Sequence, residues 1–140
     1  MPFHEKSAWV MVLGLLVTSF LYFSKVISMS YAGNIVPPSL PALLVYTVIL
    51  VVIAVVGHIL IASFSAKEAN AKLDERERQI FTKAGYFSAN VFGFGVVFSL
   101  AVYLFSHSGH LLFYMVFASL VIGQLLEYVL QIYFYRRSTY

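Results

Sequence analysis

A few polar side chains interrupt the long apolar stretches of this 140-residue sequence. His58 and Glu127 are ionisable, and Asn90 carries an amide. An imidazole close to a carboxylate can relay a proton or hold a polar ligand, and an ionisable group inside a membrane is a functional hypothesis by default. Gln124, Glu127 and Gln131 recur at three- and four-residue steps, which places them on one face of a helix. We call these five residues the polar layer.

Counting from the basic residues that flank the apolar stretches predicts similar depths for these groups. His58 lies nine residues before Lys67, and Glu127 lies nine residues before Arg136. At 1.5 Å per helical residue, both lie about 13 Å inside those anchors, and Asn90 lies about 10 Å inside its own. We therefore expect His58 and Glu127 to meet in one inward-facing layer. That layer is either a buried polar clamp or a proton-titrating or ligand-binding site.

The composition identifies the surroundings of these groups as lipid. Hydrophobic residues make up 61% of the chain and charged residues only 11%, against roughly a quarter in an ordinary globular domain. No charged residue lies between Lys25 and Lys67, or between Lys83 and Glu127. Uncharged runs of this length are typical of membrane-spanning helices, and they exclude an ordinary soluble domain.

Four segments are long enough to cross a bilayer, which requires about 20 apolar residues. Prolines precede the second segment, and a Ser/His/Gly turn at 106–110 separates the last two, which predicts a tight antiparallel hairpin. The expected fold is a single all-α domain over 1–140, an integral membrane bundle of four antiparallel transmembrane helices. The predicted spans cover about 8–27, 40–64, 84–105 and 111–134.

The distribution of Lys and Arg predicts the orientation. With four spans, eight of the nine basic residues fall on one side, and only Lys25 lies toward the other. Basic residues are retained in the cytoplasm, so both termini and the segment 66–83 should be cytoplasmic, in the cell membrane. The apolar start, followed by Ser30-Tyr31-Ala32, also fits a cleaved signal peptide, and the three remaining spans would obey the same rule.

The segment 66–83 lacks Gly and Pro and is rich in helix-forming residues, so we expect a cytoplasmic helical hairpin that turns near Asn70. It is either a solvated hairpin or a docking surface for a cytoplasmic partner or a neighbouring subunit. The candidate docking residues are Asp74, Glu75, Arg76, Glu77 and Arg78.

The same segment carries a recognisable pattern. Asp74-Glu75-Arg76-Glu77, followed by Ile80 and Lys83-Ala84, resembles the D-E-R-[DE]-x-x-I-x-x-K-A signature of an uncharacterised family of small prokaryotic membrane proteins. The resemblance covers about twenty residues and implies two spans before the motif and two after it. It implies no activity, substrate or catalytic residue.

Gly85, Ala89 and Gly93 recur at four-residue intervals in the third predicted span. This small-xxx-small stripe lets another helix approach the backbone closely. The neighbour would be another span of the same chain or the same span of a second chain. A bundle this small exposes much surface to lipid, so a homo-oligomer is a fair expectation.

Cofactor chemistry finds little support in the sequence. There are no cysteines, which excludes disulfides and thiolate ligands. His107 and His110 share the outer turn, but zinc requires three or four ligands, so we expect no metal and no cofactor. The net charge is only +3, and the basic residues flank the predicted spans, where they serve as membrane anchors. The charge therefore does not indicate nucleic-acid binding.

Three functions fit these observations, and whether the protein is an enzyme is left open. The first is a non-enzymatic accessory, regulatory or assembly component that acts through helix packing, with a membrane or cytoplasmic protein as partner. The second is a small oligomeric proton-coupled transporter or channel that uses the polar layer. The third is a membrane enzyme acting on lipophilic substrates, which we rank last because every Arg lies outside the spans.

The predicted topology can be tested because the chain has no native thiol. Single cysteines at Asn70 and Ser108 should react with a membrane-impermeant maleimide from opposite sides of the membrane. Labelling of both positions from the same side would contradict the four-span arrangement.

Overall fold

The computed structural model describes residues 3–31, 33–64 and 72–137. This part of the chain contains no β-strand beyond an isolated bridge between Tyr31 and Asn34. The predicted all-α class is confirmed. The four helices are α1 (Phe3–Met29), α2 (Leu40–Phe64), α4 (Glu75–Ser106) and α5 (Gly109–Arg137).

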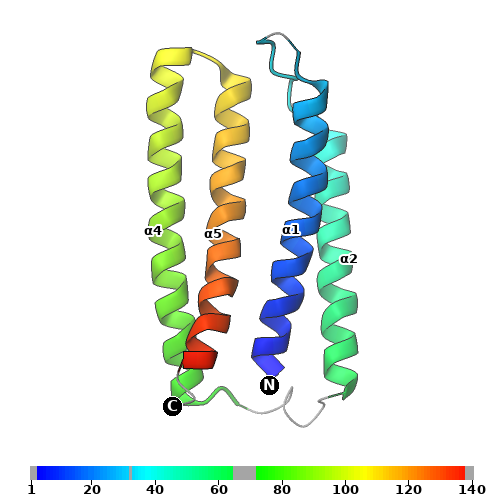
Figure 1. Cartoon of the computed structure of the whole chain (residues 1–140), viewed down its shortest axis with the longest axis vertical. Helices are drawn as coiled ribbons and strands as arrows, with labels where there is room; N and C mark the ends of the chain where they lie inside the picture. Colours follow the sequence, from blue (N-terminus) through cyan, green and yellow to red (C-terminus); the bar gives the residue numbers. More distant parts are fainter. Residues whose placement is uncertain (1–2, 32, 65–71, 138–140) are drawn as a thin grey trace.

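The helices stand side by side in the spatial order α4, α5, α1, α2, and each runs antiparallel to its neighbour (Figure 1). Helix α1 packs against both α2 and α5, and α5 also packs against α4, so α2 and α4 lie at opposite edges of the bundle. We call the end where α1 begins and α5 finishes the terminal end, and the opposite end the far end (Figure 1).

Local capping interactions define where α4 begins and finishes. Asp74 is its N-cap and forms a capping box with Glu77, in which each side chain accepts a hydrogen bond from the other residue's backbone N–H. At the far end, His107 adopts a left-handed conformation (φ 52°) and its N–H donates to the Tyr103 carbonyl over 2.8 Å. Only His107 and Ser108 separate α4 from α5, which confirms the predicted tight hairpin.

Two helices begin five or more residues before the predicted spans. Helix α4 begins at Glu75 rather than near residue 84, because the capping box starts it in the charged segment. Helix α1 begins at Phe3 rather than near residue 8. The predicted hairpin turn near Asn70 lies outside the described residues, whereas the part from Glu75 to Lys83 is helical as expected.

Glycines let neighbouring helices approach closely. A Cβ added at Gly14 of α1 would lie 3.0 Å from Ile53 of α2. In the other pair, a Cβ at Gly95 of α4 would lie 2.5 Å from the Ser119 hydroxyl of α5. Real Cβ atoms essentially never approach as closely as the second of these, so the α4–α5 contact requires glycine at position 95.

The predicted Gly85/Ala89/Gly93 stripe is not part of this packing. A Cβ at Gly85 or Gly93 would have nothing within 4 Å, and Ala89 and Gly93 are exposed. The face of α4 that meets α5 carries the buried Ser88 and Ser99 instead. Of the two neighbours considered from sequence, another span of the same chain is therefore excluded among the described residues.

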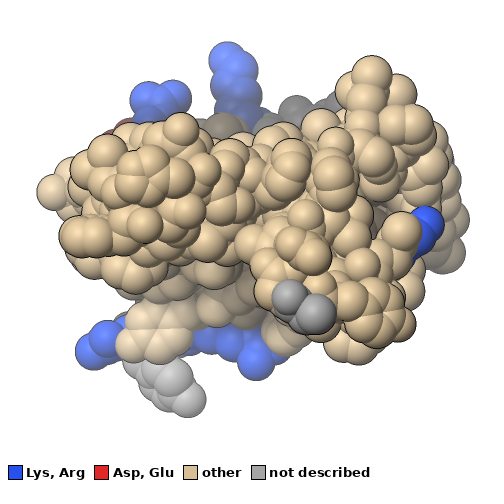
Figure 2. Space-filling model, turned by 90° about the horizontal axis from the view of Figure 1, so that it is seen from above, with Lys and Arg blue, Asp and Glu red and all other residues tan. Residues whose placement is uncertain are grey.

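The surface of the helices is apolar, as a bilayer requires. Each helix is long and apolar enough to cross a membrane, with mean hydropathy from 1.8 to 2.8 over an 18-residue window. In the most apolar helix, α2, only Tyr46 is buried, and large exposed hydrophobic side chains cover all four helices. Viewed from the far end, the molecule presents almost only uncharged residues (Figure 2). The chain is a multi-pass membrane protein.

Two of the glycines of α4, Gly95 and Gly93, should respond differently to the same substitution. Gly95→Leu forces a side chain into Ser119 and should lower the free energy of unfolding of the monomer by about 1–3 kcal/mol or more. Gly93→Leu meets open space and should leave it nearly unchanged. Thermal unfolding of dilute protein in detergent measures both. Equal destabilisation would mean that α4 is rotated relative to this structure.

Candidate functional site

Glu127 on α5 lies at the contact with α4. Its Oε2 accepts a hydrogen bond from the Ser88 hydroxyl over 3.4 Å, and its Oε1 accepts one from the Gln131 amide over 3.4 Å. Ser88 also donates to the Gly85 carbonyl. Ser88 and Gln131 are buried, and Glu127 is half-buried. The carboxyl group therefore has donors for both of its oxygens within the protein.

His58 on α2 lies at the contact with α1. Its Nε2 is 2.5 Å from the Ser7 hydroxyl, and its Nδ1 is 2.6 Å from the Ala54 carbonyl one turn earlier. Because the carbonyl can only accept, Nδ1 carries a proton and donates to it. Ser7 then donates to Nε2 if the ring is neutral, or accepts from it if the ring is charged. The ring joins α2 to α1 in either state.

The structure does not bring the polar layer together. Among the described residues, no hydrogen bond or ion pair joins His58 to Glu127, and α1 lies between the helices that carry them (Figure 1). Asn90 and Gln124 are exposed, and the Asn90 amide donates to the Tyr86 carbonyl of its own helix. Equal depth from the anchors did not reveal which helices are neighbours, so the layer divides into separate polar contacts.

A second polar cluster joins three helices at the terminal end. The buried Glu5 of α1 pairs with Arg136 of α5 over 3.3 Å, and the Arg136 guanidinium lies 5.6 Å from the Trp9 ring centre. On α5, the Tyr135 hydroxyl donates to Glu77 of α4 over 3.3 Å. The Arg136 side chain is 62% exposed, so the ion pair contributes little, about 0–1 kcal/mol. These contacts position helix ends rather than form a reactive site.

This cluster accounts for part of the Asp74-Glu75-Arg76-Glu77 motif. Asp74 caps α4, and Glu77 both completes the capping box and accepts from Tyr135 of α5. Glu75, Arg76 and Arg78 are exposed on the first turns of α4, in the position that a docking surface requires. The two acids at the ends of the motif therefore have structural roles in this chain.

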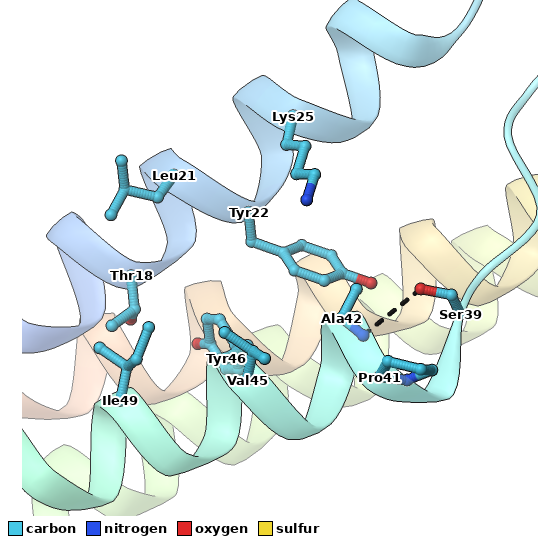
Figure 3. A pocket seen from close by; sticks show the side chains of 10 residues that line it. All are labelled: Thr18, Leu21, Tyr22, Lys25, Ser39, Pro41, Ala42, Val45, Tyr46 and Ile49. Carbon is cyan, nitrogen blue, oxygen red and sulfur yellow. Dashed lines mark hydrogen bonds between the residues drawn. The ribbon is translucent and has the colours of Figure 1, made fainter.

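Sequence reasoning did not identify a pocket between α1 and α2 near the far end (Figure 3). Its volume is about 350 Å³, within the usual size range of small-molecule sites. Lys25 and Tyr22 of α1 and Ser39 before α2 line its polar end, and Thr18 and Ile49 lie at the other end (Figure 3). The available signal was Lys25, the one basic residue predicted on the far side.

Metal chemistry gains no support from the described part of the chain, where no three His, Asp or Glu residues lie close enough to share an ion.

Comparison of the chain with models of protein families, with curated proteins and with solved structures gives no match.

Substitutions at Glu127 should distinguish hydrogen bonding from charge. Glu127→Gln keeps an acceptor at the α4–α5 contact and should change the free energy of unfolding by less than about 1 kcal/mol. Glu127→Leu leaves the buried Gln131 amide and the Ser88 hydroxyl without this acceptor and should cost about 1–2 kcal/mol. Thermal unfolding in detergent gives both values. A larger loss for Gln than for Leu would show that the carboxylate charge itself is required.

Proposed function

We propose that this protein is a non-enzymatic component of the cell membrane that works by packing its helices against other membrane helices, with a second copy of the chain as its first partner. Both termini and the segment 66–83 face the cytoplasm in this proposal, as the distribution of Lys and Arg favours. The observation that carries the proposal is the uncovered face of α4.

That face combines small residues with an amide. Helix α4 lies at an edge of the bundle, and added Cβ atoms at Gly85 and Gly93 would meet open space. Asn90 is exposed three residues before Gly93, so both lie on neighbouring turns of one face. A face of this kind lets a partner backbone approach closely, as small-residue contacts between membrane helices do.

Asn90 is the polar residue of the uncovered face of α4. Its Nδ2 donates one hydrogen bond to the Tyr86 carbonyl over 2.7 Å, and the described residues provide nothing for its oxygen. An amide oxygen exposed to hydrocarbon is unfavourable, and a donor from a partner helix relieves that cost. Asparagine both donates and accepts, so Asn90 of a second copy is a suitable partner.

Symmetry favours a second copy over an unrelated helix. Two copies inserted with the same orientation present their α4 helices in parallel when they are related by a two-fold axis along the membrane normal. Small-xxx-small faces support such parallel pairs, and a two-fold axis brings each residue of the face close to its own counterpart. The face is uncharged from Gly85 to Ser106, so no like charges oppose each other there.

The proton-transport alternative is less well supported. The helices that carry His58 and Glu127 are separated by α1, and each of the two residues is hydrogen-bonded to a different neighbour. No described contact continues from one to the other. We therefore assign these two groups to helix–helix contacts.

Single-cysteine crosslinking tests the proposal in lipid vesicles. Ala89→Cys, on the uncovered face, should form a disulfide-linked dimer under mild oxidation, and Val52→Cys, exposed on α2 at the opposite edge, should remain monomeric. Adding Asn90→Leu should lower the crosslinked fraction severalfold. Gln124→Leu is the matched control, because it removes an exposed amide from α5.

Equal crosslinking at Ala89 and Val52 after dilution into excess lipid would contradict a specific α4 contact. Crosslinking of Ala89→Cys to a different protein in native membranes, with no homodimer, would contradict the second copy as partner.

A further inference from the structure

We propose that the pocket between α1 and α2 binds an anionic phospholipid from the leaflet at the far end, with the phosphate at Lys25 and one acyl chain between the two helices. This site lies on α1 and α2, away from the uncovered face of α4, and does not depend on the contact proposed for that face.

The pocket is amphipathic along its length. Four α1 residues line it at helical spacing, from Thr18 to Lys25, a rise of about 10 Å. At the end nearer the middle of the helices, Leu21, Val45 and Ile49 provide hydrocarbon contacts (Figure 3). At the far end, the Lys25 ammonium, the Tyr22 hydroxyl and the Ser39 hydroxyl lie around the same space (Figure 3). This polarity matches that of a lipid, with its head at the interface and its chain below.

The charge at the polar end is uncompensated. Among the described residues, no carboxylate pairs with Lys25. Among the described acids, Glu5 at the start of α1 and Asp74, Glu75 and Glu77 at the start of α4 lie at the terminal end, far from Lys25. Glu127 lies 18 residues from the start of α5, about 27 Å along the helix. An anion from outside the chain is therefore the available partner for this ammonium group.

Two hydroxyl groups can add hydrogen bonds to such an anion. Ser39 accepts from the Ala42 backbone N–H over 3.4 Å, which leaves its O–H able to donate. The Tyr22 hydroxyl has no hydrogen-bond partner among the described residues, although the tyrosine ring is buried. Together with Lys25, these groups supply three donors, and a phosphate has oxygen acceptors for them.

The exposed wall of the pocket, which opens toward the bilayer, favours a phospholipid over a free fatty acid. Leu21 and Val45 line it and are 57% and 58% exposed, so this wall faces the bilayer. A lipid with two chains can place one chain in the pocket and leave the other in the membrane. A second, adjacent pocket of about 180 Å³ shares Tyr22, Lys25 and Ser39 and gives the head group room beside the first.

Native mass spectrometry with defined lipids tests the site. The wild-type protein, released from detergent with equal phosphatidylglycerol and phosphatidylcholine, should retain one phosphatidylglycerol preferentially. Lys25→Met should weaken that binding roughly tenfold, the size expected for losing one charge-assisted contact. Lys25→Arg should retain most of it. Lys83→Met, an exposed cation on α4, is the matched control and should bind like wild type.

Filling the pocket tests the acyl-chain part separately. Ala42→Leu adds volume to the wall shared by both pockets and should weaken phosphatidylglycerol binding while leaving Lys25 in place. Unchanged thermal unfolding of each variant without lipid confirms that the helices still pack.

Equal retention by Lys25→Met and Lys83→Met would overturn the site and leave Lys25 as an interfacial anchor. Equal binding of phosphatidylcholine by wild type would overturn the anionic head group. A separate arm with oleate should show weaker binding, and preferential oleate binding that depends on Lys25 would contradict a phospholipid as the occupant.

Discussion

Close approach of helix backbones is the constraint on which the structure depends. Lipid chains are as apolar as the side chains that they contact, so moving an apolar side chain from lipid into a helix–helix contact gains little free energy. Membrane helices therefore associate where small residues permit dense packing and where polar groups meet. Gly14 and Gly57 serve the α1–α2 contact, and Gly95 and Gly123 serve the α4–α5 contact, each facing a side chain of the opposite helix. The α1–α2 pair and the α4–α5 pair are joined where α1 meets α5. A small core of Ala8, Val12 and Ile132 and, at the far end, a cluster of aromatic side chains form this contact.

The polar groups follow the same neighbour relations. His58 bonds across α2 and α1, Glu127 across α5 and α4, and Glu5 across α1 and α5. Each adjacent pair of helices thus has a polar contact in its terminal half. Because His58, Glu127 and Glu5 each bond to a residue of an adjacent helix, each of them stabilises one helix–helix contact. This distribution favours a packing role over a proton pathway.

The arrangement also leaves two kinds of surface for other molecules. An edge helix, α4, exposes small residues and Asn90, which suits a second helix. The α1–α2 pair diverges enough toward the far end to leave a pocket beneath Lys25, which suits a lipid. The tight glycine contacts of this pair, at Gly14 and Gly57, lie nearer the terminal end, so the pocket lies beyond the point of closest approach.

The sequence by itself determined the helical class, the approximate spans, the short turn after Ser106 and the placement of the start of α1 and the end of α5 at the same end of the bundle (Figure 1). These properties depend on local composition and on helix length, which a single segment carries within itself. The relative position of segments depends on which helix faces meet, and only the tertiary structure decided that. Gly93 and Gly95 are two residues apart, yet one meets open space and the other meets Ser119, because α5 covers one side of α4. For the same reason, His58 and Glu127 have matching depths but different neighbours, and Lys25 acquires a pocket from residues of α2 that its own segment does not contain.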